Sequence, residues 1–110
     1  MKKVSLVIDI TGIELPPDEK KETPEHLFWT VTQNVLLGYA NQQRGFTEPE
    51  RRQYYKISDA FEVVLKDKGT EVELEDDWVG LLRKAFREAK LMPNKLLRVV
   101  ENNIEAIKDR

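Results

Sequence analysis

Residues 70–90 read Thr-Glu-Val-Glu-Leu-Glu-Asp-Asp-Trp-Val-Gly-Leu-Leu-Arg-Lys-Ala-Phe-Arg-Glu-Ala-Lys, and this stretch decides the fold. Val72 and Leu74 alternate with glutamates, which is the period of a half-buried strand. Asp76 and Asp77 follow, and carboxylates there favour a helix start because they stabilise the positive end of the helix dipole. Apolar residues then recur at helical spacing, namely Trp78, Leu81, Leu82, Ala85 and Ala89, with Phe86 at the margin. The stretch therefore predicts a strand over 71–74 and an amphipathic helix after it.

Two helices are predicted upstream of this unit. Thr23-Pro24-Glu25 combines a capping hydroxyl, a proline at the first helical position and an acid, so we expect a helix over 24–43 with Gly45 just beyond it. Thr47 and Glu50 have capping-box spacing and begin a second helix, which Gly69 ends.

The ends of the chain complete the pattern. Residues 3–10 are rich in branched side chains and predict a strand. Thr11-Gly12 signals a turn or bulge, residues 13–15 offer a continuation of that strand, and residues 18–22 read as an exposed connector. Downstream, Pro93 ends the third helix and opens a fourth, whose inner stripe is Leu96, Leu97, Val100, Ile104 and Ile107.

The predicted fold class is α+β and mostly helical, in a single domain over residues 1–110. About four helices accompany a small two-stranded element made of the N-terminal strand and residues 71–74. The two strands satisfy each other's backbone either within one chain or across a dimer, and a ribbon of two strands needs helices to cover it.

Composition excludes several classes of function. The chain of 110 residues has no cysteine and one histidine, which rules out disulfides, thiolate catalysis, cysteine-ligated metals and a multi-histidine site within one chain. Its net charge of −2 gives no global attraction to nucleic acid or anionic lipid. No apolar run is long enough to span a bilayer, and no secretory signal is convincing. We therefore expect a cytoplasmic protein without a membrane partner or cofactor.

Catalytic residues are not predicted. Lone His26 lies in the first turn of a helix, and the serines lack a glycine elbow or an activating base. A metal-dependent enzyme would have to use the acids of 71–77, but three of them face solvent on a strand and two stand at a helix start: Glu71, Glu73, Glu75, Asp76 and Asp77. We expect a protein that is not an enzyme and has no metal site.

A basic patch is the candidate for nucleic-acid binding. It spans the end of the third helix and the start of the fourth, and consists of Arg83, Lys84, Arg87, Lys90, Lys95 and Arg98. Such a set could contact phosphates, and helix, short turn, helix is compatible with a helix-turn-helix. The turn has no glycine, however, and the fourth helix offers few base-reading side chains at its start, so a solvated face is the favoured reading.

Aromatic and apolar residues on the first two helices are the candidate protein interface. Trp29 and Leu36 are expected to project away from the main apolar face of the first helix, and Tyr55 away from that of the second. Together with Tyr39, they either close a compact core from the side or anchor a partner, and a homodimer is the simplest form of the second case. A first helix that is apolar over so much of its circumference is either central to the fold or covered by another chain.

The order of these motifs resembles small uncharacterised bacteriophage and prophage accessory proteins. The resemblance is carried by the N-terminal strand, by the leucine-rich helix, by residues 50–58, and by 72–77 with its acidic helix start. It implies a phage-encoded accessory or assembly protein that works by binding. The leading hypothesis is accordingly a non-enzymatic protein–protein interaction module that forms a homodimer, and the alternative is a nucleic-acid-binding regulator that uses the basic patch.

Overall fold

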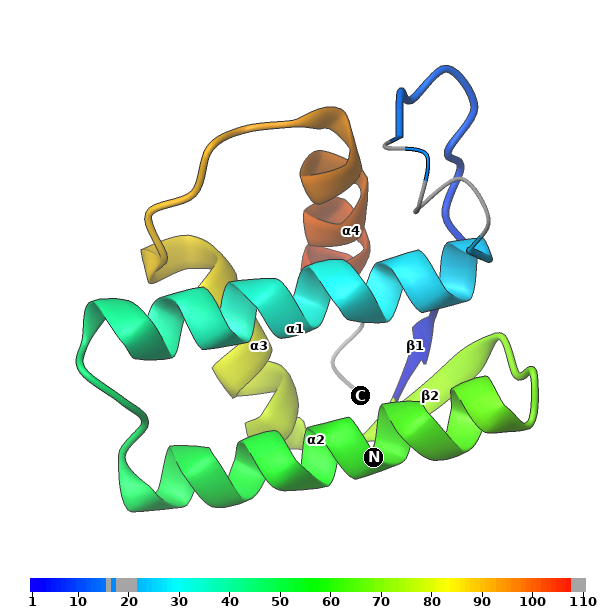
Figure 1. Cartoon of the computed structure of the whole chain (residues 1–110). Coiled ribbons are helices and arrows are strands. Elements are labelled where there is room, and N and C mark those ends of the chain that lie inside the picture. Colours follow the sequence, from blue (N-terminus) through cyan, green and yellow to red (C-terminus); the bar gives the residue numbers. More distant parts are fainter. Residues whose placement is uncertain (16, 18–21, 108–110) are drawn as a thin grey trace.

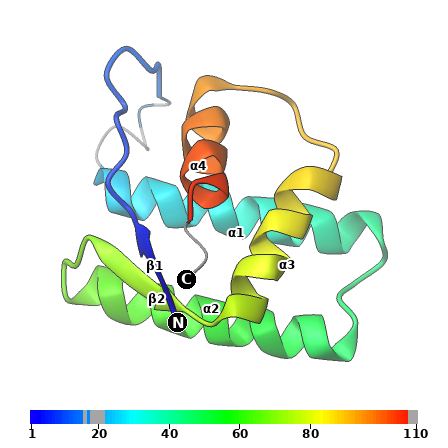
Figure 2. The same cartoon turned by 180° about the vertical axis from the view of Figure 1, so that it is seen from behind.

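The computed structural model describes residues 1–15, 17 and 22–107. Within that part the elements are β1 (Lys2–Ser5), α1 (Pro24–Gln42), α2 (Glu48–Lys66), β2 (Glu71–Leu74), α3 (Asp76–Glu88) and α4 (Lys95–Glu105). Figures 1 and 2 show two layers: α1 and α2 form an antiparallel hairpin, and the sheet, α3 and α4 lie together behind it. The predicted α+β, mainly helical fold class is confirmed. The predicted connector lies outside the described residues except for Glu22.

The sheet forms within one chain, by antiparallel pairing of β1 with β2. Lys2 pairs with Leu74 and Ser5 pairs with Glu71, so the register turns Val4, Val72 and Leu74 into the core. The predicted first strand over 3–10 is too long. Because β2 has only four residues, the ladder beyond Ser5 holds one more bond, from the N–H of Leu6 to the carbonyl of Thr70 at 2.8 Å.

The chain turns at Thr11-Gly12, as expected, and residues 13–15 do not continue the strand. The carboxylate of Asp9 accepts a hydrogen bond from the N–H of Thr11 at 2.9 Å, and Gly12 has a φ of 79°, which a side chain would disfavour.

Side-chain caps mark the N-terminal ends of α1, α2 and α4. The Thr23 hydroxyl caps α1, and Thr47 with Glu50 forms both halves of a capping box on α2, as predicted. The fourth helix begins two residues later than Pro93, because the side chain of Asn94 accepts from the N–H of Leu97 at 2.7 Å and acts as its N-cap. Helix α3 ends at Glu88.

The core lies between the two layers. The ring of Phe61 stacks on Trp29 with centroids 4.5 Å apart and on Phe28 at 6.1 Å. Trp29 and Leu36, which the sequence places away from the main apolar face of α1, are also buried, at 6% and 0% exposed, so they close the core. The physical reason is that α1 packs against α2, α3 and α4 at once, so most of its circumference is covered by its own chain.

Candidate interaction surfaces and a carboxylate network

The four residues predicted as a protein interface do not lie on one surface. Trp29 and Leu36 belong to the core, and Tyr39, at 5% exposure, turns its ring inward as well. Tyr55 alone is open to solvent, with 58% of its surface exposed. For the first three residues the structure favours the reading in which they complete the core.

Tyr55 lies in an aromatic and apolar patch on the α1–α2 hairpin that we call the hairpin face. Its ring meets Tyr54 edge-on at 6.1 Å, and Tyr54 stacks on Phe46 at 5.4 Å. The side-chain amide of Gln33 donates to the Tyr54 hydroxyl at 3.2 Å and so joins α1 to this cluster. One turn after Gln33, Leu37 is 45% exposed. The hairpin face comprises Leu37, Phe46, Tyr54 and Tyr55.

Leu37 and Phe46 were not singled out from the sequence. Helical periodicity could have predicted that Leu37 is exposed, because it lies about 200° around α1 from the buried Val35. No comparable signal exists for Phe46, which stands in the connection between the two helices and contacts Tyr54 only through tertiary packing.

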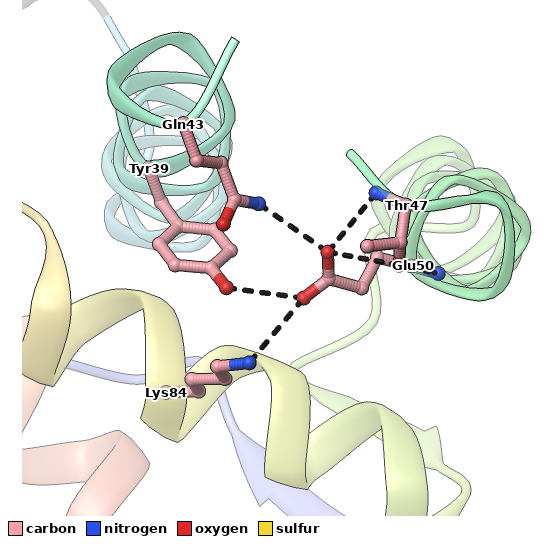
Figure 3. A network of polar contacts seen from close by, with 5 residues as sticks. All are labelled: Tyr39, Gln43, Thr47, Glu50 and Lys84. Atoms are coloured by element: carbon pink, nitrogen blue, oxygen red, sulfur yellow. Dashed lines mark hydrogen bonds and ion pairs between the residues drawn. The ribbon is translucent and has the colours of Figure 1, made fainter. Parts of the chain in front are cut away.

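A second feature of the hairpin is a network centred on the carboxylate of Glu50 (Figure 3). One oxygen accepts from the N–H and hydroxyl of Thr47, at 3.1 and 3.0 Å, and from the Gln43 amide at 3.3 Å. The other accepts from the Tyr39 hydroxyl at 3.1 Å and lies 3.7 Å from the Lys84 ammonium. A single carboxylate thus connects α1, α2 and α3.

The electrostatics of this network favour the charged state of both ionised partners. Burial acts to raise the pKa of Glu50, but hydrogen bonds from Thr47 and Tyr39 and the charge of Lys84 outweigh it, so the pKa is lowered. The Tyr39 hydroxyl, with Glu50 and Glu88, raises the pKa of Lys84. Each group is held by neighbours in its ordinary ionic form. The network therefore holds the hairpin on α3.

Three residues of the predicted basic patch contact groups of the same chain. The guanidinium of Arg83 donates to the carbonyl of Ile107 at 2.6 Å, and Lys84 faces Glu50. Arg87 makes two hydrogen bonds to Glu105, at 3.1 and 2.8 Å. The other three cations, Lys90, Lys95 and Arg98, are exposed in the α3–α4 connection and on α4. Half of the set is therefore engaged by groups of the same chain.

The acids of 71–77 do not form a cluster of metal ligands. Glu71 and Glu73 are exposed on the outer face of the sheet, and Asp76 and Asp77 occupy the first turn of α3. In residues 1–15, 17 and 22–107, no group of three or more His, Asp or Glu side chains is placed to hold a metal ion. His26 is exposed, and its backbone N–H donates to the capping hydroxyl of Thr23.

The surface also has a groove of about 700 Å³ between the Gly12–Leu15 turn, α1 and the start of α4. Its walls are mainly apolar, with Val31 and Leu97 half-buried, and Glu14 and Lys95 are its charged residues. No hydrogen bond joins those two among the described residues.

Comparisons of the chain with protein-family models, with curated proteins and with solved structures give no match. Among the described residues, no helix is long and apolar enough to cross a membrane.

Proposed function

We propose that the chain is a non-enzymatic protein–protein interaction module that forms a homodimer through the hairpin face. The observation that supports this proposal is the exposure of Tyr55 and Leu37 beside the ring pair of Tyr54 and Phe46. Large aromatic side chains are enriched at interfaces, where they bury much area for little loss of conformational entropy. A twofold axis would place the same patch of each copy on the other.

The charges on α2 favour a second copy as the occupant. Arg51, Tyr55, Asp59 and Glu62 follow at spacings of three and four residues, so they share one side of the helix, and all are exposed. The cation stands near the start of this row and the acids near its end. When two copies of α2 pack antiparallel, Arg51 of each faces Glu62 of the other, and Tyr55 lies near the twofold axis.

The size of the hairpin limits the strength of such a dimer. Two helices of 19 residues, about 28 Å long and together about 20 Å wide, offer roughly 560 Å² of flat area per copy. A standard stable interface buries about 800 Å² per partner. The dimer should therefore dissociate on dilution and weaken with salt.

The proposal includes a cytoplasmic location and a phage- or prophage-encoded accessory role, the latter implied by the resemblance in helix capping and amphipathic pattern.

The test is molar mass by light scattering on a size-exclusion column across a dilution series. We expect a concentration-dependent dimer that Tyr55→Glu and Leu37→Glu each convert to monomer. Met92→Glu is the matched control, because Met92 is 85% exposed and lies in the α3–α4 connection. Circular dichroism and thermal unfolding establish that each variant is folded.

A charge exchange tests the antiparallel arrangement. Arg51→Glu and Glu62→Arg alone should weaken the dimer, and the double variant should restore it. A wild-type monomer at every concentration would refute the homodimer, as would a dimer that Tyr55→Glu leaves intact. If such a monomer bound DNA in a salt-dependent manner that Lys95→Glu and Arg98→Glu abolish, the nucleic-acid alternative would replace the proposal.

A further inference from the structure

The register of the sheet fixes which backbone groups of β1 face outward. The N–H of Leu6 bonds to the carbonyl of Thr70, directly opposite in the register. In an antiparallel ladder, hydrogen-bonded and non-hydrogen-bonded pairs alternate. Val4 and Lys2 therefore bond to β2, whereas the N–H and C=O groups of Lys3 and Ser5 point to the opposite edge of β1.

One contact confirms this orientation. The side-chain amide of Asn103, on α4, donates to the carbonyl of Ser5 at 3.0 Å, from the side away from β2. The amide N–H of the Asn103 side chain occupies the position that a backbone donor from a third strand would take. Among the described residues, no hydrogen bond is made to the carbonyl of Lys3 or by the N–H of Lys3 or Ser5.

A hollow of about 460 Å³ runs beside this edge. Residues 1–5 line one side of it, Asn103, Ala106 and Ile107 the other, and Asp76 also contributes. All four residues of β1 line the hollow, so it lies beside the strand with which an added segment would pair. Its lining residues come from β1, α4 and the start of α3. These elements lie behind α1 and α2, which carry the hairpin face (Figures 1 and 2).

We propose that the outer edge of β1 binds an extended polypeptide segment of a protein partner, which adds to the sheet as a third strand. The segment hydrogen-bonds to the backbone of Lys3 and Ser5, as in other cases of strand addition. Its residue opposite Lys3 is acidic, since opposite charges on facing strands attract. The next residue points inward beside Val4 and towards Ala106 and Ile107, so it is apolar.

Asn103 has a defined part in this binding. Its amide satisfies the Ser5 carbonyl in the free protein and swings away when the segment arrives. The opposing interpretation is that Asn103 only protects an exposed edge from pairing, as edge strands commonly require. The two interpretations predict different results when an extended peptide is added to the protein: binding at the edge in the first case and no binding in the second.

The probe is a capped synthetic peptide that copies residues 70–75, Thr-Glu-Val-Glu-Leu-Glu, because its acids and apolar residues alternate as the edge requires. Amide hydrogen exchange followed by NMR is expected to slow at Lys3 and Ser5 when the peptide binds and to stay unchanged at Val4 and Leu6. Slowing at none of these amides, or only at Val4 and Leu6, would overturn the proposal.

Proline variants separate binding from folding. Ser5→Pro removes an outward N–H that β2 does not use, and prolines are tolerated on edge strands, so the variant should fold and lose the peptide. Val4→Pro, the matched control, removes an N–H of the β1–β2 ladder and should destabilise the fold. Undiminished peptide binding by Ser5→Pro would refute the edge as the site, and so would binding of a peptide N-methylated at every residue.

Asn103→Ala tests the exchange of partners. It frees the Ser5 carbonyl and should tighten peptide binding by about twofold to tenfold, the range expected for one hydrogen bond. Weaker or unchanged binding would show that Asn103 does not act in this way. Peptide binding at the β1 edge does not depend on the hairpin face, so the Tyr55→Glu variant should bind the peptide as the wild type does.

Discussion

Replacement of Glu50 by alanine should destabilise the protein much more than replacement of an ordinary surface glutamate. The Glu50 side chain is only 13% exposed and accepts from Tyr39, Gln43 and Thr47. Its removal leaves the hydroxyl of the buried Tyr39 without this acceptor and breaks the capping box of α2. Glu48→Ala is the matched control, because Glu48 lies in the same helical turn and makes an exposed ion pair with Arg52.

The expected magnitude follows from the separate contacts. An unsatisfied buried hydroxyl costs about 1–3 kcal/mol, and the lost half of the capping box about 0.5 kcal/mol. The Lys84 ion pair contributes at most about 1 kcal/mol, since the lysine side chain is 52% exposed. Together these give about 3 kcal/mol for Glu50→Ala. Glu48→Ala should cost about 0.3–0.5 kcal/mol.

The assay is urea unfolding at neutral pH, followed by tryptophan fluorescence and circular dichroism. A double-mutant cycle of Glu50→Ala with Tyr39→Phe should yield a coupling free energy of about 1 kcal/mol or more, because the two side chains share a hydrogen bond. A cost within about 0.5 kcal/mol of the Glu48→Ala control, or a coupling near zero, would refute the assignment of Glu50 as the connecting group.

The pH dependence has a definite sign. The pKa of Glu50 is lowered in the folded state from an ordinary value of 4.5, so the unfolded state binds its proton first as the pH falls. The stabilisation is fully present above pH 4.5 and is lost as the pH falls through the folded-state pKa. The stability difference between the wild type and Glu50→Gln should therefore shrink in acid, and a difference independent of pH would contradict this reasoning.

Two further predictions concern packing and surface charge. Phe61→Ala should cost about 3–5 kcal/mol in urea unfolding because it empties the space between Trp29 and Phe28, and a loss below about 1 kcal/mol would contradict the described stacking. Arg87→Ala should lower the free energy of unfolding by less than about 1 kcal/mol despite two hydrogen bonds to Glu105, because the arginine side chain is 64% exposed. A double-mutant cycle with Glu105→Ala measures the coupling free energy directly.

Features set by neighbouring residues were predictable from the sequence. The caps at Thr23 and Thr47 depend on residues within one turn, and the alternation of Val72 and Leu74 is a property of β2 itself. The capping-box spacing of Thr47 and Glu50 was therefore recognised. The contacts of the same carboxylate with Tyr39 and Lys84 were not predictable, because they depend on how three helices pack.

Features set by distant segments were missed or misjudged. The length of β1 is limited by its partner, so its own run of branched residues overestimates the strand. For Trp29 and Leu36 the sequence leaves open whether they close the core or anchor a partner, because helical periodicity defines the faces of α1 without showing how many neighbours cover them. Asn103 has no sequence signal at all, since it meets Ser5 across a separation of 98 residues.

That separation also orders the events of folding. The ladder hydrogen bonds of β1 are made with residues 71–74, and the carbonyl of Ser5 accepts from Asn103 on α4, so β1 cannot acquire these native neighbours during synthesis until most of the chain has emerged. The α1–α2 hairpin, in contrast, is built from contacts close in sequence, which form early because they close short loops. Although β1 precedes the helices in the sequence, it is thus among the last of the described elements to be fixed, and Val4 and Leu6 remain exposed to chaperones and proteases during that interval.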